Sequence, residues 1–189
     1  MHRTTLRLAA CACLGSLLLI AGCGSDSDAS GAGASNSGET ACRYTDAGCA
    51  LSCGDSCEPE CMYVKGVCDI TCGKDCSPVC RDTINFGPCN MVCGDNCDPY
   101  CWIGEVCNLK CGTSCTARCS YVQSCNFTVG DNSTVACLLD EYCVVGCTGS
   151  CHVGCTQTPV CQVTCQQGNP VTCTDGTLGC GSGCSLSLR

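Results

Sequence analysis

The chain has 189 residues, of which 31 are cysteine, while Phe, Tyr and Trp together make up only 4%. So few aromatic side chains cannot build an ordinary apolar core, so disulfide bridges or metal ions must supply much of the order. The formal net charge of -8 argues against a nucleic-acid partner, because the phosphate backbone selects a basic surface. The composition is therefore typical of an exported protein and not of a cytosolic enzyme.

The first 22 residues predict a secretory signal. Arg3 and Arg7 precede an uncharged apolar run over residues 8–21, which is too short for a membrane-spanning helix. The run ends in Leu-Ile-Ala-Gly-Cys at residues 19–23, which resembles the lipobox of bacterial lipoproteins. The resemblance implies that Cys23 becomes the acylated first residue of the mature protein. An ordinary signal peptide with a cysteine near its end is the alternative.

The same resemblance predicts where the protein is located. Many such lipoproteins are retained at the inner membrane by an aspartate after the lipidated cysteine, and Gly24 stands there instead. We therefore expect an exported, lipid-anchored protein of the bacterial cell envelope, at the outer membrane. Residues 24–41 carry no large apolar side chain and predict a flexible tether. The expected organisation is a signal peptide at 1–22, the lipidated cysteine and tether at 23–41, and a Cys-rich repeat domain at 42–189.

The repeat domain consists of units of 18–21 residues, and positions within a unit are counted below as offsets from its first cysteine. Cysteines recur at offsets 0, 4, 8 and 12, offsets 2 and 10 are apolar, and offset 5 is glycine in the first five units. The fifth unit has Val129 and Ser133 at offsets 4 and 8 but keeps the other features. The seven units begin at residues 49, 68, 89, 107, 125, 143 and 161.

This pattern predicts strands, although a four-residue cysteine spacing could also mark one face of a helix. Cysteine and apolar residues alternate, which is a strand pattern, and Pro59, Pro78 and Pro99 would interrupt successive helices. The fold class that we expect is all-β: a flattened, disulfide-rich β-solenoid of about seven coils, capped by residues 174–189. The alternative is a set of irregular small repeats stapled by disulfides.

The 28 cysteines of residues 42–189 are an even number, so disulfides are their expected state in an exported protein. Symmetry within a coil suggests pairing offset 0 with offset 12 and offset 4 with offset 8, since the two cysteines of each pair would face each other across one reversal of the chain. Bridges between adjacent coils are the alternative, because the stacking distance also suits a disulfide. The outer pairs would be Cys49–Cys61, Cys68–Cys80, Cys89–Cys101, Cys107–Cys119, Cys125–Cys137, Cys143–Cys155 and Cys161–Cys173. The inner pairs would be Cys53–Cys57, Cys72–Cys76, Cys93–Cys97, Cys111–Cys115 and Cys147–Cys151. This scheme leaves Cys42, Cys165, Cys180 and Cys184 over.

Other chemistry is sparse in the sequence. The repeat domain has no C-x-C or C-x-x-C pair, the spacing typical of a thiolate metal store. Asp55, Asp95 and Asp131 share offset 6 and could form an acidic edge for calcium, although a solvated turn is the simpler interpretation. His152 is expected on the surface and not as a catalytic base. We thus expect no cofactor and no enzyme, but a rigid structural or adhesive envelope module, with a divalent-metal-binding protein as the alternative.

Overall fold

The computed structural model describes residues 36–37, 40–83 and 87–188, so the predicted signal peptide and the predicted lipidation site, Cys23, lie outside the described residues. The described part is built almost entirely of strands, with one short 3-10 helix at its C-terminal end. The strands are β1 (Asn36–Ser37), β2 (Ala41–Arg43), β3 (Cys49–Ser52), β4 (Glu60–Met62), β5 (Cys68–Thr71), β6 (Val79–Thr83), β7 (Cys89–Cys93), β8 (Tyr100–Cys111), β9 (Thr116–Val129), β10 (Ser133–Leu138), β11 (Tyr142–Cys147), β12 (Cys151–Thr156), β13 (Val160–Cys165), β14 (Val171–Thr172) and β15 (Leu178–Cys180).

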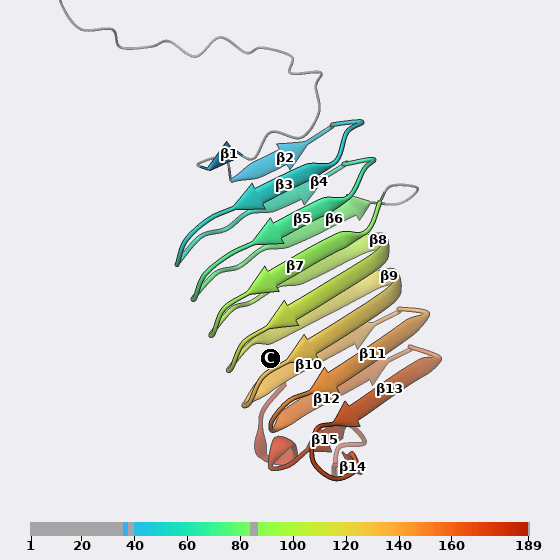
Figure 1. The fold of residues 1–189 in the computed structure, drawn as a ribbon. Coiled ribbons are helices and arrows are strands. Elements are labelled where there is room, and N and C mark those ends of the chain that lie inside the picture. The colour runs from blue at the N-terminus through green and yellow to red at the C-terminus, as the bar shows by residue number, and fades with distance from the viewer. Residues whose placement is uncertain (1–35, 38–39, 84–86, 189) are drawn as a thin grey trace, which may run out of the picture.

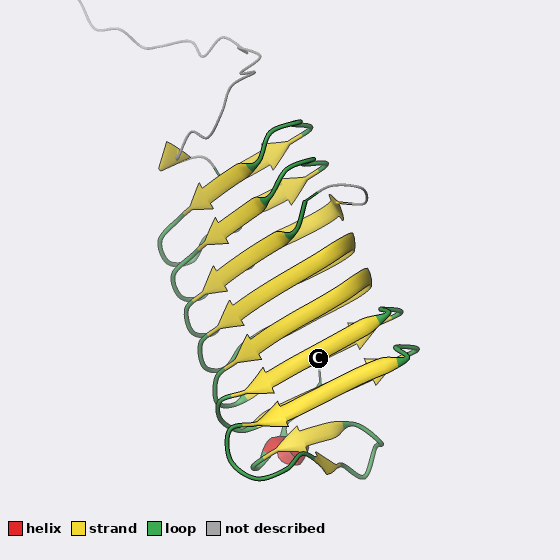
Figure 2. Ribbon diagram, turned by 45° about the vertical axis from the view of Figure 1, so that its right-hand side comes forward, coloured by secondary structure: helices red, strands yellow, loops and turns green. Residues whose placement is uncertain are grey.

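The strands stack in parallel into a flattened β-solenoid, as the sequence predicts (Figures 1 and 2). One face of the stack carries β3, β5, β7, β11 and β13, and the other carries β2, β4, β6, β10 and β12. The long strands β8 and β9 bend round one edge and belong to both faces. Adjacent coils are in register, so that cysteine lies over cysteine along the stack, as Cys89, Cys107 and Cys125 do.

The core is a narrow layer between the two faces. Side chains at offset 2 point inward, and all seven, from Leu51 to Val163, are buried. In the first six units, side chains at offset 10 meet them from the opposite face, and Pro59, Pro78 and Pro99 are among the most deeply buried residues, whereas Val171 of the seventh unit is exposed. Proline lacks the N–H that a ladder needs, but here its carbonyl still accepts a hydrogen bond from the next coil, as Pro59 does from Val79 at 2.9 Å. The apolar residues that mark the repeat thus form the core.

Each coil turns twice, and almost every turn uses one residue with positive φ; the corner of the sixth unit, at Ser150, does not. The Gly-x-x corner after offset 4 has it at offset 7, in small polar residues such as Asn96 (φ 58°) and Asn132 (φ 57°). The return after offset 12 has it at offset 14, where Ile103 (φ 55°) and Tyr121 (φ 58°) stand. Asparagine tolerates this conformation, whereas a β-branched residue is strained in it. The sequence therefore predicts the Gly-x-x corner but gives no signal for the positive φ in the return.

The C-terminal end departs from the parallel stack. Residues 174–189 are expected to form a degenerate terminal coil, but β15 pairs antiparallel with both β12 and β14. The 3-10 helix η1 (Gly183–Ser185) follows and packs against β12. This hairpin pairs with the edge of β12 that an eighth parallel coil would otherwise use, and so it blocks strand addition on that face of the stack.

Candidate functional site

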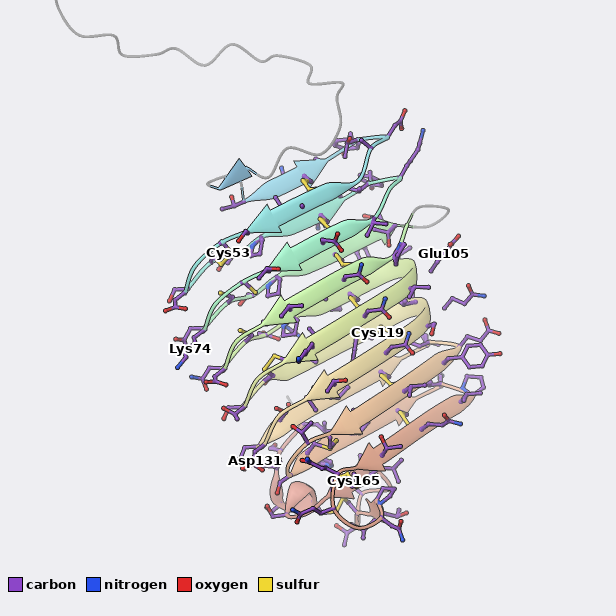
Figure 3. All side chains as sticks on the ribbon, viewed as in Figure 1. Cys53, Lys74, Glu105, Cys119, Asp131 and Cys165 are labelled. Carbon is purple, nitrogen blue, oxygen red and sulfur yellow. A yellow bond between two sulfur atoms is a disulfide. The ribbon has the colours of Figure 1, made fainter. Side chains whose placement is uncertain are left out.

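The described residues hold twelve disulfides, and their sulfur atoms follow the stack from end to end (Figure 3). The predicted outer pairing is wrong. Each cysteine at offset 12 bonds to offset 0 of the following unit, across the return, and not to offset 0 of its own unit. The observed outer bridges are Cys42–Cys49, Cys61–Cys68, Cys80–Cys89, Cys101–Cys107, Cys119–Cys125, Cys137–Cys143 and Cys155–Cys161, and Cys173 pairs with Cys184.

Chain connectivity slightly favours the observed pairing. Cys80 Sγ lies only 4.0 Å from Cys68 Sγ, the partner that we expected, yet its bond goes to Cys89. The return closes a loop with a sequence separation of 9 in this pair, against 12 for the pairing within the unit. A shorter loop costs less closure entropy. The sequence does hold a signal for this, because Cys42, which the expected scheme leaves over, stands seven residues before Cys49.

The predicted inner bridges form in three coils and are absent from two. Cys53–Cys57, Cys111–Cys115 and Cys147–Cys151 are bonded as predicted. Cys165, whose unit has no cysteine at offset 8, bonds to Cys180 in the terminal hairpin. Four cysteines at the same offsets in two adjacent coils remain free thiols, and we call them the thiol cluster: Cys72, Cys76, Cys93 and Cys97.

The thiol cluster is compact and buried. Cys72 Sγ lies 3.2 Å from Cys93 Sγ, and the sulfur atoms of Cys72, Cys76 and Cys97 all lie within 4.8 Å of one another. Cys76 Sγ is also 3.1 Å from Cys57 Sγ, which belongs to the inner bridge of the preceding coil. Exposed fractions are 1% for Cys76 and Cys97 and 7% and 6% for Cys72 and Cys93. Register alone brings the four together, because β5 and β7 are adjacent parallel strands.

The surroundings raise the pKa of three of these thiols, those of Cys72, Cys76 and Cys97. The Cys72 thiol donates a hydrogen bond to the sulfur of Cys93, which, with burial, raises its pKa far above the ordinary value. Burial raises the pKa of Cys97 to about 11 and also raises the pKa of Cys76. The Cys76 thiol donates to the Lys74 carbonyl oxygen at 3.2 Å, and the Cys97 thiol to the Gly73 carbonyl oxygen at 3.3 Å. Because the thiolate is the form that is oxidised, these three thiols react slowly with oxidants.

The aspartates at offset 6 join coils together. The Oδ1 atom of Asp55 accepts a hydrogen bond from the backbone N–H of Lys74 at 2.8 Å. Asp95 accepts one from Thr113 at 2.9 Å, and Asp131 accepts one from Ser150 at 2.7 Å. Each carboxylate therefore caps the corner of the next coil, along the edge where Figure 3 labels Lys74 and Asp131.

His152 is buried, with 3% exposure, so its predicted place on the surface is wrong. It does lie on the outer side of β12, but the terminal segment folds over that face. Its Nδ1 contacts the Leu186 carbonyl oxygen at 2.6 Å, and its Nε2 contacts Thr177 Oγ1. The side chain thereby attaches the C-terminal segment to the stack, an arrangement that the repeat pattern could not reveal.

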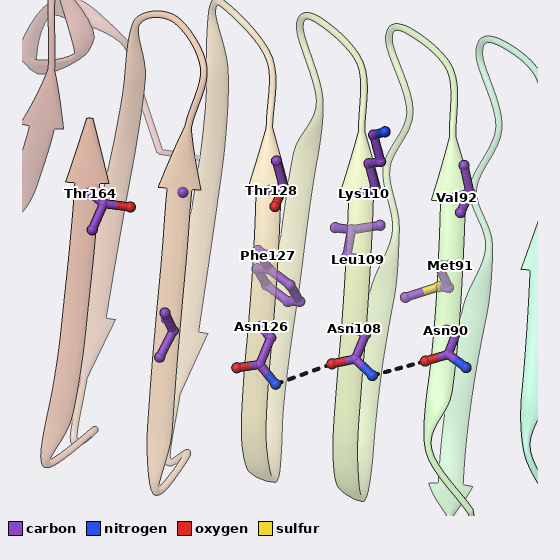
Figure 4. A pocket seen from close by; sticks show the side chains of 12 residues that line it. Asn90, Met91, Val92, Asn108, Leu109, Lys110, Asn126, Phe127, Thr128 and Thr164 are labelled. Carbon is purple, nitrogen blue, oxygen red and sulfur yellow. Dashed lines mark hydrogen bonds between the residues drawn. The ribbon is translucent and has the colours of Figure 1, made fainter. Parts of the chain in front are cut away.

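A shallow groove of about 490 Å³ crosses the outer surface of β7, β8, β9, β11 and β13 (Figure 4). An amide ladder runs along it: Asn126 Nδ2 donates to Asn108 Oδ1 at 3.1 Å, and Asn108 Nδ2 donates to Asn90 Oδ1 at 2.8 Å. Asn90 in turn donates to Asp69 Oδ1 at 2.8 Å. These amides donate hydrogen bonds to one another across adjacent coils and so stabilise the stack.

No family model, curated protein or solved structure matches this chain. Among residues 36–37, 40–83 and 87–188, no helix is both long and apolar enough to cross a membrane.

Proposed function

We propose that the protein is a non-enzymatic, lipid-anchored component of the bacterial cell envelope whose rigid, acidic rod acts as a structural or adhesive surface module. The covalent ladder carries this proposal. Bridges lie at the returns of successive coils from Cys42 to Cys161, and two more hold the terminal hairpin. Such cross-links preserve shape by restricting the unfolded chain, and they persist in the oxidising conditions outside the cytoplasm.

The topology also supports an orientation for the rod. The described chain enters the stack at β1 and β2, and β14 and β15 close the opposite end (Figure 1). An acyl group on Cys23 would precede β1 by a short tether. The end formed by β2, β3 and β4 would then lie nearest the membrane, and the terminal hairpin would face outward.

The anchoring part of the proposal is tested by Cys23→Ala, with Cys13→Ala as the matched control in the same leader segment. We expect the Cys23→Ala protein to accumulate as a precursor or in the soluble fraction, because stable attachment needs two acyl chains or more. The Cys13→Ala protein should remain in the membrane fraction at mature size. Fractionation and mass spectrometry distinguish the two results. Membrane retention of Cys23→Ala at mature size would contradict the lipid anchor.

The second candidate function, divalent-metal binding, loses support at the acidic edge. Asp55, Asp95 and Asp131 each commit one carboxylate oxygen to a backbone N–H of the next coil. Lys74 Nζ, moreover, lies 3.6 Å from Asp95 Oδ2 and offsets its charge. A hard cation prefers several free oxygens at one point, so this edge is better explained as a structural contact.

A further inference from the structure

We propose that Cys72, Cys76, Cys93 and Cys97 form a binding site for one thiophilic d10 cation of the Zn²⁺, Cd²⁺ or Cu⁺ class. Sulfur ligands select such ions over the hard cations that carboxylates bind. The site goes beyond the anchoring and structural role proposed above and does not depend on it.

The sulfur positions suit one ion. Tetrahedral coordination with metal–sulfur bonds of about 2.3 Å places neighbouring sulfurs about 3.8 Å apart. The Cys72–Cys93 sulfur distance of 3.2 Å is slightly shorter, and the sulfurs of Cys72, Cys76 and Cys97 lie within 4.8 Å of one another. Three of the sulfurs thus lie within reach of a common ion, and Cys93, which contacts Cys72, would supply the fourth after side-chain rotation.

The positions of the four ligands follow from the repeat. Cys72 and Cys76 occupy offsets 4 and 8 of one coil, and Cys93 and Cys97 occupy the same offsets of the next. Hydrogen bonds between the two coils fix their spacing, since the N–H of Cys72 donates to Val92 O at 2.9 Å. The small exposure of Cys72 and Cys93 marks the side from which an ion can enter.

The coil tolerates the loss of an inner bridge, so cysteines at these offsets are free to serve another purpose. In the fifth unit Val129 and Ser133 replace both cysteines, yet both side chains are fully buried and the strands β9 and β10 keep their register with neighbouring coils. Ser133 Oγ even accepts a hydrogen bond from the backbone N–H of Cys115 at 3.1 Å. Two adjacent coils with unbridged cysteines therefore provide four sulfur ligands, and the missing inner bridges do not disrupt the stack.

Binding is an exchange of protons for metal with no change of oxidation state. With Zn²⁺, four thiols lose four protons to solvent and four zinc–sulfur bonds form. The competing reaction is oxidation, which would form the Cys72–Cys76 and Cys93–Cys97 bridges that symmetry suggests and remove every ligand. A count of free thiols separates the two reactions.

The test uses the full chain, purified from the envelope without reductant. Denaturing alkylation with mass spectrometry counts the thiols, and titration with Cd²⁺ alone follows the sulfur-to-metal charge-transfer absorbance. Two variants copy the fifth unit, Cys72→Val with Cys76→Ser and Cys93→Val with Cys97→Ser. The matched control, Cys111→Val with Cys115→Ser, makes the same change in a bridged pair. Zn²⁺ and Cu⁺ are titrated in the same way.

We expect four free thiols and one Cd²⁺ per wild-type chain and per control chain, with affinity at least 10-fold weaker in either cluster variant. Equal binding by all proteins, no binding despite four free thiols, or no free thiols in the wild type would each overturn the proposal. If a variant does not fold, the test is instead made on the native wild type, by comparing the alkylation of its cysteines with and without Cd²⁺. Cd²⁺ should then protect these four cysteines and no others, and undiminished alkylation would contradict the site.

Discussion

At the scale of single residues, Asp140 is a buried acidic side chain with only part of its hydrogen-bonding capacity satisfied. It is 1% exposed, its Oδ1 accepts a hydrogen bond from the N–H of Val122 at 2.9 Å, and its Oδ2 has no hydrogen-bond partner. Burial, only partly opposed by backbone hydrogen bonds, raises its pKa to about 6, against 3.8 for an ordinary aspartate. The folded protein therefore holds this carboxyl more easily as the neutral acid.

The pH dependence follows from the raised pKa. Well below pH 3.8 the Asp140 carboxyl is neutral in both the folded and the unfolded state, so it does not lower the free energy of unfolding. Above pH 6 it is charged in both states, and folding must bury that charge. The wild type should thus lose up to about 3 kcal/mol of unfolding free energy from this group between pH 4 and pH 8. Asp140→Asn should raise the free energy of unfolding at pH 8 and change it little at pH 4. Guanidinium unfolding of the oxidised protein at the two pH values measures both effects.

Asp46→Asn is the matched control for that substitution, because Asp46 is exposed and pairs with Lys65 at 2.6 Å on the surface. Surface ion pairs contribute about 0–1 kcal/mol. The control should therefore show no comparable gain at pH 8. An Asp140→Asn protein that behaves like the control at both pH values would contradict the buried charge.

At the scale of the elements, the glycines at offset 5 allow coils to approach closely at the Gly-x-x corner. A Cβ on Gly94 would lie 2.9 Å from the carbonyl carbon and oxygen of Gly73. A Cβ on Gly54, at the same offset of the first unit, would meet nothing within 4 Å. The glycine is thus required by the preceding coil and not by the turn conformation.

We expect Gly94→Ala to destabilise the oxidised protein by about 1–3 kcal/mol, since the clash is with backbone that cannot yield easily. Gly54→Ala should have almost no effect and serves as the control. Unfolding midpoints in guanidinium measure the difference. Equal midpoints for the two variants would show that these coils do not stack at the observed spacing.

The sequence was sufficient to predict the strands, the Gly-x-x corner and three inner bridges, but not the return or the outer bridges. Apolar residues at offsets 2 and 10, from Leu51 to Val153, alternate as strands do, and they form the core. The offset-12 cysteines lie close to two possible partners, as Cys80 does to Cys68 and Cys89, so symmetry alone could not choose. His152 was misplaced because the segment that covers it lies outside the repeat.

The candidate site was also only partly accessible to sequence reasoning. All four cysteines of the thiol cluster stand at offsets that predicted inner bridges, and nothing in the repeat distinguishes their two coils from the bridged ones. The contact between Cys72 and Cys93 joins different coils at 3.2 Å. Such a contact depends on the stacking register, which a comparison within one unit does not include.

At the scale of the whole molecule, one covalent ladder follows the parallel stack, and its outer bridges cross the returns. The bridges secure the order of the coils, and the hydrogen-bonded ladders and aspartate caps secure their spacing. A rod held in this way needs no large aromatic core, which agrees with the aromatic content of 4%.

Disulfide mapping tests this claim most directly. The oxidised protein is denatured without reductant in the presence of the alkylating agent, so that its free thiols are blocked, and is then cut with trypsin after lysine and arginine. Without bridges between them, residues 44–65, 66–74 and 75–81 would be separate peptides. We predict that 44–65 and 66–74 are joined through Cys61 and Cys68, because that bridge crosses the cleaved return. An unattached peptide 44–65 with Cys49 bonded to Cys61 would place the outer bridges inside the coils and contradict the ladder.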